Sequence, residues 1–468
     1  MVVAPGGEAL VIAANRLPVE RADPASPWRT SPGGLVSALI PVLQRQPGVW
    51  VGWAGAADED LDPFDFEGLS LQPVTLSATD IERYYEGFSN ATLWPLYHDV
   101  TGEAVFERGW WEAYSRVNQR FAEAASRSAP PGSTVWVHDY QLQLVPALLR
   151  RARPDLRIGW FNHIPFPGYE IYARLPWRHQ IVEGLLGADL LGFQRRDDAV
   201  NFLRAARRCA EVVTRGSVVE YGDRQIRVGA FPISVDTAAL DALARDPTTR
   251  ARARQIRHDL GDPEAVLLGV DRLDYTKGII NRLRAYSELL EEGAVGPPRT
   301  VLIQVASPSR DRVREYQLLR EELETLVGRI NGDYSSVGRP AIHYLHQSFP
   351  RDEMAALYLT ADVMLVTPLK DGMNLVAKEY VACRSDESGV LVLSEFTGAV
   401  DDLRQAIVIN PWDMDGTKEA IRQALNGGGA ATRRRMRTMR NHIFTEDVHH
   451  WAAAFLGALE LTVDRDPR

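Results

Sequence analysis

The sequence has little cysteine and no long apolar run. Its 468 residues include two cysteines, Cys209 and Cys383, far apart and without metal-ligand spacing, so neither a disulfide framework nor a structural zinc site is expected. No stretch of 18 apolar residues occurs, which argues against a helix that crosses a membrane. Residues 5–8 read Pro-Gly-Gly-Glu, where a signal peptide has its apolar run. These absences predict a cytoplasmic protein.

Positive charge is also scarce. Lys and Arg number 53 against 62 Asp and Glu, which gives a net charge of −9 and a pI near 5.7. Nucleic acid and anionic membrane are therefore excluded as main partners, because the chain offers no global positive field. A local basic pocket for an anionic substrate stays possible. No GxGxxG fingerprint follows an expected strand, which argues against a nicotinamide dehydrogenase.

The length exceeds that of one ordinary domain and suits two. Short apolar runs alternate with helical patterns, which predicts two doubly wound, Rossmann-like α/β domains with parallel sheets and a cleft between them. We place the boundary near Asp236, giving domains 1–236 and 237–468, and expect the last helix (448–461) to pack back on the first. The expected strands are Leu10–Ala14, Val49–Trp53, Thr134–Val137, Ile158–Phe161, Asp189–Phe193, Ile226–Phe231, Ala265–Val270, Thr300–Ala306, Ile342–Leu345, Val363–Thr367 and Val390–Leu393.

Polar residues follow several expected strands of the first domain. Ligands bind beyond the carboxyl ends of parallel strands, and Arg16, Asp139 and His163 all follow such ends. Carboxylate and imidazole groups suit a ligand rich in hydroxyls. Gly34 opens a helix whose backbone N–H groups can approach a phosphate. The alternatives are a plain tight turn at Gly34 and structural, hydrogen-bonded roles for the other side chains.

The second domain carries more basic residues at its strand ends. Arg272 and Lys277 lie five residues apart on one loop, a spacing that suits a diphosphate clamp. Arg310 follows another strand. Asp371 and Gly372 precede a helix that is expected to begin near Asn374. Glu379 lies within that helix, where its carboxylate can accept hydrogen bonds from ribose hydroxyls. The alternatives are surface ion pairs for the basic residues and a helix-dipole role for Glu379.

Long motifs in this sequence resemble the trehalose-6-phosphate synthases. The similarity runs in order from about residue 10 to residue 413 and is greatest to the compact bacterial form, especially that of actinobacteria. The motifs are Asn15–Val19, Phe88–Leu96, Asp139–Leu142, His163–Pro167, Asp271–Gly278 and Asp371–Glu379. The resemblance implies the GT-B fold and a retaining glucosyltransferase. Its expected reaction moves glucose from UDP-, GDP- or ADP-glucose to glucose 6-phosphate and yields α,α-trehalose 6-phosphate and a nucleoside diphosphate.

The resemblance also implies a role for each matching residue. It implies an N-terminal acceptor-binding domain, a C-terminal nucleotide-sugar domain, no cofactor, no metal, and a homodimer or homotetramer. The residues implied as catalytic are Asp139, His163, Arg272, Lys277 and Asp371. Those implied at the acceptor are Arg16, Tyr85, Trp94 and Arg310 for its phosphate and Asp139 for its sugar. Those implied at the donor are His163 and Asp371 for glucose, Arg272 and Lys277 for the diphosphate, Glu379 for the ribose, and Gly34, Gly372, Met373, Asn374 and Leu375 for the phosphate cradle.

Three features complicate this interpretation. Asn162 stands where the family usually has an apolar residue, and Gly168-Tyr169 departs from the usual small or apolar pair. Asp413–Thr417 matches the DxDGT signature of haloacid-dehalogenase phosphatases, but too few residues follow it, and we interpret it as an N-cap before a helix over 417–425. The rival functions are a pseudo-glycosyltransferase that joins cyclitols and a non-catalytic sugar-phosphate sensor. Both are disfavoured because the implied site residues are all present.

Overall fold

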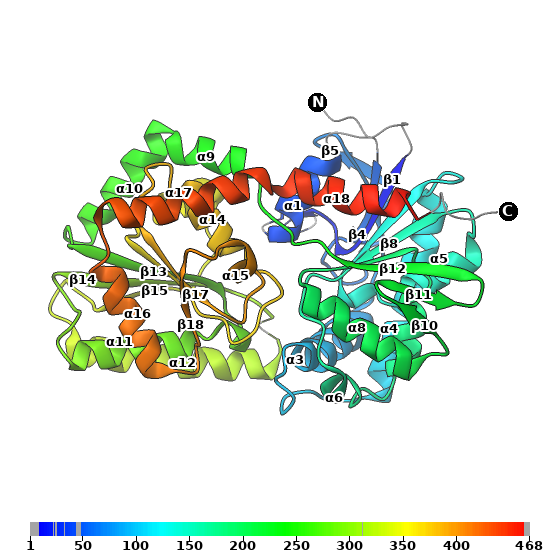
Figure 1. The fold of residues 1–468 in the computed structure, drawn as a ribbon, viewed down its shortest axis with the longest axis horizontal. Coiled ribbons are helices and arrows are strands. Elements are labelled where there is room, and N and C mark those ends of the chain that lie inside the picture. Colours follow the sequence, from blue (N-terminus) through cyan, green and yellow to red (C-terminus); the bar gives the residue numbers. More distant parts are fainter. Residues whose placement is uncertain are drawn as a thin grey trace. The chain divides into compact units, whose positions relative to one another are not determined.

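A computed structural model describes residues 9–21, 23, 26–31, 33–43, 48–310 and 312–462. Residues 5–8, on which the signal-peptide argument rests, lie outside these ranges, as does Pro32 beside Gly34. The chain forms two compact units (Figure 1): unit 1 holds the described residues up to Ile233 and from His449, and unit 2 runs from Ser234 to Val448. No helix of the described residues is long and apolar enough to cross a membrane.

Unit 2 is built on a parallel sheet in the strand order β15-β14-β13-β16-β17-β18. Numbered along the chain, this is 3-2-1-4-5-6, the order of a Rossmann sheet. Its strands are β13 (Ala265–Arg272), β14 (Thr300–Ser307), β15 (Ile342–Leu345), β16 (Val363–Val366), β17 (Val390–Ser394) and β18 (Ile407–Ile409). Its helices are α9 (Thr237–Arg245), α10 (Pro247–Asp259), α11 (Ile279–Glu291), α12 (Arg314–Tyr334), α13 (Arg351–Thr360), α14 (Leu375–Cys383), α15 (Ala399–Asp402), α16 (Met414–Leu425) and α17 (Gly429–Thr445), with a 3-10 turn, η3 (Tyr275–Lys277).

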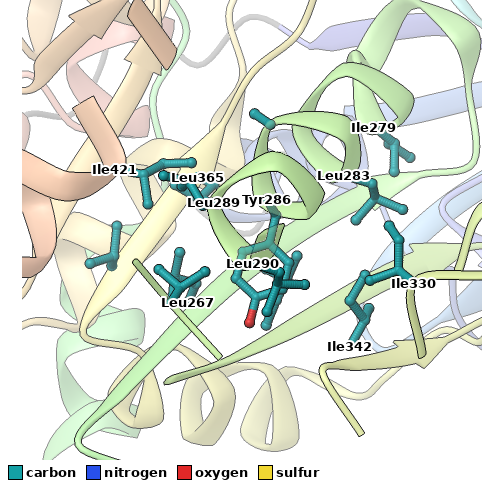
Figure 2. Packing of buried hydrophobic residues seen from close by; sticks show 14 of the residues in the cluster. Leu267, Ile279, Leu283, Tyr286, Leu289, Leu290, Ile330, Ile342, Leu365 and Ile421 are labelled. Atoms are coloured by element: carbon teal, nitrogen blue, oxygen red, sulfur yellow. The ribbon is translucent and has the colours of Figure 1, made fainter. Parts of the chain in front are cut away.

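The core of unit 2 lies between the sheet and helices α11, α12 and α16. Leu267 from β13 and Leu283 from α11 are fully buried there, and Figure 2 shows them on facing elements. Tyr286 lies in the same cluster, and its hydroxyl donates a hydrogen bond to the Ala341 carbonyl at 3.2 Å. A buried phenol with a satisfied hydroxyl adds apolar area without a desolvation penalty. This core fixes where β13 and β16 end, and so where the loops after them begin.

Unit 1 repeats the arrangement with a longer sheet, in the order β10-β11-β12-β9-β8-β7-β1-β4-β6-β5. The parallel strands are β1 (Leu10–Arg16), β4 (Gly48–Trp53), β6 (Leu69–Pro73), β7 (Thr134–His138), β8 (Arg157–Phe161), β9 (Leu190–Phe193) and β12 (Arg224–Ala230). Antiparallel strands edge the sheet, namely β5 (Phe64–Phe66), β10 (Val213–Arg215) and β11 (Val218–Tyr221), and a separate ribbon pairs β2 (Val19–Glu20) with β3 (Arg29–Thr30).

The helices of unit 1 include one unusual element, a π-helix that spans thirteen residues. Helices of this kind are rare and occur mostly at functional sites. The helical segments are α1 (Gly34–Leu43), α2 (Ala78–Asp80), the π-helix η1 (Ile81–Leu93), α3 (Trp94–Tyr97), α4 (Arg108–Ser128), the 3-10 turn η2 (Tyr140–Leu142), α5 (Val145–Ala152), α6 (Tyr169–Tyr172), α7 (Arg178–Leu185), α8 (Arg196–Cys209) and α18 (Val448–Glu460).

The C-terminal helix α18 packs directly on the sheet of unit 1. Its Phe455 ring stacks on Trp136 of β7, with ring centroids 4.7 Å apart. Glycines in the two neighbouring strands make room for it, because a Cβ at Gly159 or Gly192 would lie within 2.7 Å of the Phe455 ring. Trp451, one turn earlier on α18, lies edge-on to Phe161 of β8. The last helix therefore completes the core of unit 1.

All eleven expected strands are present, with ends shifted by at most two residues. The sequence analysis missed β6 and β18 as well as the antiparallel edge strands and the β2–β3 ribbon. β18 has three residues and the edge strands three or four, too few for a periodic pattern to stand out from loop sequence. Both cysteines are free and buried.

Candidate active-site residues

In both sheets, the strand order reverses at one point. In unit 1 the reversal lies between β1 and β7, and in unit 2 it lies between β13 and β16. Connections leave the two strands toward opposite sides of such a point and open a crevice at their carboxyl ends, where ligands bind. Arg16 ends β1, Asp139 follows β7, Arg272 ends β13 and Asp371 lies five residues after β16. The topology alone therefore brings predicted residues to the two most favourable places.

Arg16 and Tyr85 meet on the same tryptophan in unit 1. The Arg16 guanidinium lies over the ring of Trp53, 4.6 Å from its centroid, and Tyr85 contacts that ring edge-on at 5.7 Å. Gly55 allows this placement, because a Cβ there would lie 2.4 Å from Arg16 Nη2. Stacking on an aromatic ring orients a guanidinium while leaving its N–H donors available. This arrangement suits a phosphate or another anion.

Asp139 adopts a strained backbone at the end of β7. Its φ of 75° and ψ of 174° fall in a region that is almost confined to glycine. Two contacts hold it there: its N–H donates to the Phe161 carbonyl at 2.7 Å, and its Oδ1 accepts from the backbone N–H of His163 at 3.0 Å. Strain of this kind persists where the surrounding structure fixes it and is concentrated at functional sites.

His163 is paired with a second histidine. Its Nε2 lies 3.0 Å from Nδ1 of His138, a hydrogen-bond distance. Burial lowers the pKa of His163 to about 3. Burial, and repulsion whenever His163 is itself protonated, hold the pKa of His138 well below its usual value. Both rings are therefore neutral at physiological pH, and His163 can offer sugar hydroxyls a hydrogen bond but no positive charge.

Trp94 begins α3, directly after the π-helix. Its ring lies 4.1 Å from that of His98 and 5.7 Å from that of Tyr140. The Tyr140 hydroxyl in turn donates to Asn90 Oδ1 at 2.8 Å, which ties the π-helix to the residue after Asp139. Trp94 is buried at 4% exposure. Gly34 is the first residue of α1, as predicted.

In unit 2, Lys277 and Asp371 form an ion pair between two loops. Lys277 Nζ lies 2.7 Å from Asp371 Oδ2, and both side chains are largely buried. Asn374 Nδ2 donates to the same carboxylate oxygen at 3.2 Å, and its Oδ1 caps α14 by accepting from the Ala377 N–H. Asn374 has a φ of 82°, which an asparagine side chain tolerates better than most. Helix α14 thus begins at Leu375, where the sequence predicted it.

Asp274 lies close to two arginines of the same region, Arg272 and Arg310. Arg310 Nη1 lies 3.4 Å from its carboxylate and Arg272 Nη2 lies 4.0 Å away. Burial opposes the charge on Asp274, but Arg310, Arg272 and Lys277 outweigh it and hold the pKa of Asp274 well below its usual value. A buried carboxylate that stays ionised orients the guanidiniums around it and leaves the cluster with a positive excess.

The loops that carry these residues are locked to each other by their backbones. The N–H of Leu369 donates to the Thr276 carbonyl at 2.7 Å. Gly278 has a φ of +63°, and a Cβ there would lie 2.2 Å from the Thr367 carbonyl oxygen. The close approach needs a glycine for both reasons. It places the first turn of α11, with its free N–H groups, beside the loop of Asp371.

Glu379 stands apart from the cluster on the second turn of α14. Its Oε2 accepts a hydrogen bond from the Tyr358 hydroxyl at 2.7 Å. Burial raises the pKa of Glu379, against the hydrogen bond from Tyr358. The neighbouring Lys378 forms a buried ion pair with Asp402 at 2.7 Å, which anchors the helix. A second oxygen of Glu379 is available to pair with ligand hydroxyls.

Comparisons with known proteins identify the family of this chain. The profile described as glycosyltransferase family 20 matches residues 8–461. The chain belongs to glycosyltransferase family 20. The family member trehalose-6-phosphate synthase of Mycobacterium avium (strain 104) is 57% identical, covering 98% of this chain and 97% of its own.

Two solved structures of family 20 relatives resemble this fold closely. An α,α-trehalose-phosphate synthase (UDP-forming) from Burkholderia xenovorans, in complex with glucose-6-phosphate, has a TM-score of 0.90 at 34% identity and covers 97% of this chain and 100% of its own. An E. coli structure bound with UDP-2-fluoro glucose has a TM-score of 0.88 at 35% identity and covers 96% and 98%. The predicted fold class, two Rossmann-like units of the GT-B type, is confirmed.

The predicted residues of this family 20 chain divide unevenly between the units. Arg310 lies in unit 2, whereas the other residues expected at the acceptor lie in unit 1. Gly34 and His163 lie in unit 1, whereas the other residues expected at the donor lie in unit 2. Three of the eight non-glycine residues with positive φ among the described residues are predicted site residues, namely Asp139, Arg310 and Asn374.

Four further residues hold the predicted ones, and the sequence analysis considered only Asp274 among them, as a possible ion-pair partner of the basic residues. They are Trp53 beneath Arg16, His138 beside His163, Asp274 among the arginines, and Tyr358 on Glu379. A signal was present for three of them. Trp53 ends an expected strand, His138 directly precedes Asp139, and Asp274 lies between Arg272 and Lys277. For Tyr358, which lies 21 residues before Glu379, the sequence offers none.

The two unusual segments of this family 20 chain are accommodated locally. Asn162 is fully buried, and its Nδ2 donates to the Ile164 carbonyl at 2.7 Å, while its Oδ1 has no hydrogen-bond partner among the described residues. Gly168 precedes the short helix α6, whose first residue, Tyr169, packs under the guanidinium of Arg208. Neither change displaces the Asp139–His163 hydrogen bond.

The DxDGT segment is an N-cap, as predicted. Asp413 Oδ1 accepts from the Gly416 N–H at 3.0 Å, and the helix behind it, α16, begins at Met414. The predicted helix start at Thr417 is wrong by three residues, because the capping residue is Asp413, which lies before the Asp-Gly pair at 415–416. Two hollows lie elsewhere: one of about 350 Å³ near Gly389 and Met439 in unit 2, and one of about 710 Å³ near Arg151 and Arg224 in unit 1. No predicted site residue lines either.

Proposed function

We propose that this chain is a retaining glucosyltransferase that moves glucose from a nucleotide-glucose to glucose 6-phosphate and forms α,α-trehalose 6-phosphate. The observation that carries the proposal is the gathering of the predicted residues at the two points where the strand order reverses. A trehalose-6-phosphate synthase at 57% identity over 98% of this chain supports the proposal.

In this proposal, all the acceptor-binding residues except Arg310 lie in unit 1. Arg16, held on Trp53 with Tyr85 beside it, supplies a forked guanidinium for the phosphate dianion, and Arg310 supplies a second. Trp94 adds an apolar wall. The Asp139 carboxylate, already fixed by the His163 N–H, orients the acceptor sugar. The known complex of the Burkholderia xenovorans relative with glucose-6-phosphate supports this choice of acceptor.

All the donor-binding residues except Gly34 and His163 lie in unit 2. Arg272 and Lys277 neutralise its diphosphate, helped by the backbone N–H groups of residues 372–375 at the start of α14. In the free protein Lys277 is paired with Asp371, so diphosphate binding must share or release that lysine. Asp371 then becomes available to the hydroxyls of the donor glucose. Glu379 accepts the ribose hydroxyls.

The reaction needs positioning and charge stabilisation rather than a protein nucleophile. The bond from glucose C1 to the diphosphate oxygen breaks, and a bond from C1 to the acceptor hydroxyl oxygen forms on the same face. The proton of that hydroxyl passes to the leaving diphosphate. Arg272 and Lys277 stabilise the charge that develops on the diphosphate, and Asp139 holds the acceptor hydroxyl close to C1. Neutral His163 contributes a hydrogen bond to the transferred glucose.

One experiment tests both the proposed reaction and the identity of the nucleotide base of the donor. We propose a uridine donor, because the relative from Burkholderia xenovorans is UDP-forming and the E. coli structure holds a UDP-glucose analogue. The experiment follows nucleoside diphosphate release from the full chain with glucose 6-phosphate and UDP-, GDP- or ADP-glucose. We expect release with UDP-glucose, and trehalose 6-phosphate as the product. Release from none of the three donors would contradict the proposal, and preferential use of GDP- or ADP-glucose would contradict the uridine assignment alone.

We further propose that the enzyme works in the cytoplasm as a homodimer or homotetramer, as the family resemblance implies. Its two buried free thiols suit a reducing compartment. Light scattering of the purified chain measures the assembly, and a mass of 52.2 kDa would contradict it.

A further inference from the structure

The His138–His163 pair has a structural feature that substrate binding does not explain. His138 lies at the end of β7 and is fully buried, so it is not placed to touch a substrate. Its Nδ1 is 3.0 Å from Nε2 of His163, which uses one ring nitrogen of each residue. Its other nitrogen, Nε2, is buried and has no hydrogen-bond partner among the described residues.

Only one proton is shared between the two rings, and its position decides what His163 can offer. A neutral imidazole carries a proton on one nitrogen and a lone pair on the other. If His138 Nδ1 donates, its Nε2 is a lone pair, and the proton of His163 lies on Nδ1. If His138 accepts instead, its Nε2 carries a buried N–H without a partner, and His163 presents a lone pair at Nδ1.

The surroundings of His138 favour the first arrangement. An unpartnered buried N–H is rare in folded proteins and costs more than an unpartnered acceptor. The rings around His138 include Trp136 at 4.6 Å and Trp451 at 6.5 Å. The indole nitrogens of both tryptophans are also buried and unpartnered, and an indole is a donor only. Neither these rings nor any other described group accepts a hydrogen bond from His138 Nε2, so a proton on that nitrogen would be buried without an acceptor.

We infer that His138 is a positioning residue that holds His163 in the Nδ1-protonated tautomer, so that His163 presents a hydrogen-bond donor to the sugar. Trp451 of α18 supports the pair by lying 6.1 Å from the His163 ring. Burial lowers the pKa of both histidines, so the pair stays neutral and the tautomer persists across the physiological range. The consequence for transfer rests on the proposed function, but the tautomer itself does not.

Two variants separate positioning from simple packing. In His138→Asn the amide nitrogen lies as many bonds from Cα as Nδ1 does, so it can still donate to His163. In His138→Gln the amide lies one bond farther out, at the place of Nε2, and the donor is lost. We expect the kcat of His138→Gln to fall about 10- to 100-fold, the range that outer partners of functional histidines show in metal sites. His138→Asn should keep most of the activity, with the KM for glucose 6-phosphate little changed in both.

The deciding measurement is the tautomer of His163, read from long-range 1H–15N spectra of full-length protein with 15N-labelled histidine. His163→Gln identifies its signals among the ten histidines. We expect the proton on Nδ1 in the wild type and in His138→Asn, and a tautomer mixture in His138→Gln. A wild-type proton on Nε2 would overturn the inference, as would equal activity and equal spectra in the two variants. If neither variant folds, the wild-type spectrum decides alone.

These readouts distinguish the inference from the proposed function. A wild type that releases no nucleoside diphosphate contradicts the function and leaves the tautomer measurable. An active wild type with the wrong tautomer contradicts the inference alone. A merely structural role for His138 would lower the melting temperature and activity of both variants in parallel and leave the His163 tautomer unchanged.

Discussion

The two units share the same order of parallel strands, but their predicted site residues differ in charge. In unit 2 the predicted residues lie in a network of formal charges, with Lys277 on Asp371 and two arginines around Asp274. In unit 1 the corresponding place holds a neutral histidine pair, a strained aspartate, and an arginine held by an aromatic ring rather than a carboxylate. The same sheet edge can therefore be built for charge or for hydroxyl recognition, and the side chains at the strand ends decide which.

In the proposed function, this difference corresponds to what the residues of each unit would recognise. A diphosphate carries charge that only nearby cations stabilise well, and cations held close together need carboxylates among them. A sugar presents hydroxyls, for which neutral donors and acceptors at fixed positions suffice. Arg16 of unit 1 and Arg310 of unit 2 are the exceptions, because the expected ligand of both is the phosphate of the acceptor.

The largest effect is expected from removing charge in unit 2. Arg272→Ala should lower kcat by about 10²- to 10³-fold, the cost of losing one preorganised group at a developing charge. Its side chain is 48% exposed, so the fold should be retained. The measurement is turnover with saturating donor and acceptor, alongside a melting curve.

Arg284→Ala is the matched control for Arg272→Ala. Arg284 is in the same unit, is also exposed, and pairs with a surface carboxylate, Glu322. Its loss should leave turnover unchanged, because exposed ion pairs contribute little. Near-normal turnover in Arg272→Ala would refute the diphosphate clamp and remove the contrast between the units.

The next effect concerns the backbone contact that locks the loops of unit 2. Gly278→Ala should destabilise the protein by about 2 kcal/mol or more beyond its control, because the new Cβ would meet the Thr367 carbonyl oxygen at 2.2 Å. Gly261→Ala is the control, since Gly261 has a φ of +82° but no heavy atom within 4 Å of the added Cβ. Urea unfolding midpoints compare the two. Equal losses would show that backbone strain alone matters.

The last effect is expected from acid and reports on unit 1. His138 and His163 are neutral in the folded chain, whereas in the unfolded chain they take up protons as the pH falls below about 6.5. The unfolded state then binds more protons, so stability falls as the pH drops from about 6.5 toward the folded pKa of His163, about 3. Each histidine contributes at most about 1.4 kcal/mol per pH unit.

His138→Asn and His258→Gln test this acid sensitivity. Stability measured by urea unfolding at pH 7 and pH 5 should fall less in His138→Asn than in the wild type, because one buried group no longer titrates. His258→Gln removes an exposed histidine and leaves the buried pair in place, so it serves as the control. An identical pH dependence in all three proteins would contradict the neutral pair.

Much of the architecture was readable from the sequence because buried parallel strands leave continuous apolar runs. The run ending in Ala14 and the run beginning at Ala265 are examples, and both strands lie at the centre of their sheets. The helix after Asn374 was also predicted correctly, because the cap residue and the turn glycine stand next to each other. Strands of three residues, such as β18, leave no such trace.

The partners of the site residues were harder to predict, for a physical reason. Lys277 and Asp371 are 94 residues apart, and they meet because β13 and β16 are neighbours in the sheet. Trp53 and Arg16 meet because β1 pairs with β4. Strand order is set by how helices cover the sheet and how the loops connect, which no local pattern encodes.

The sequence by itself determined the α/β class, the chemistry available at each strand end, and a basic site within a chain of net charge −9. These depend on residue type and local periodicity, both of which are local properties. The tertiary structure alone decided which groups are charged, paired or strained: the neutral His138–His163 pair, the ionised Asp274 and the backbone of Asp139. Those properties depend on burial and on contacts between distant segments, which exist only once the sheets have formed.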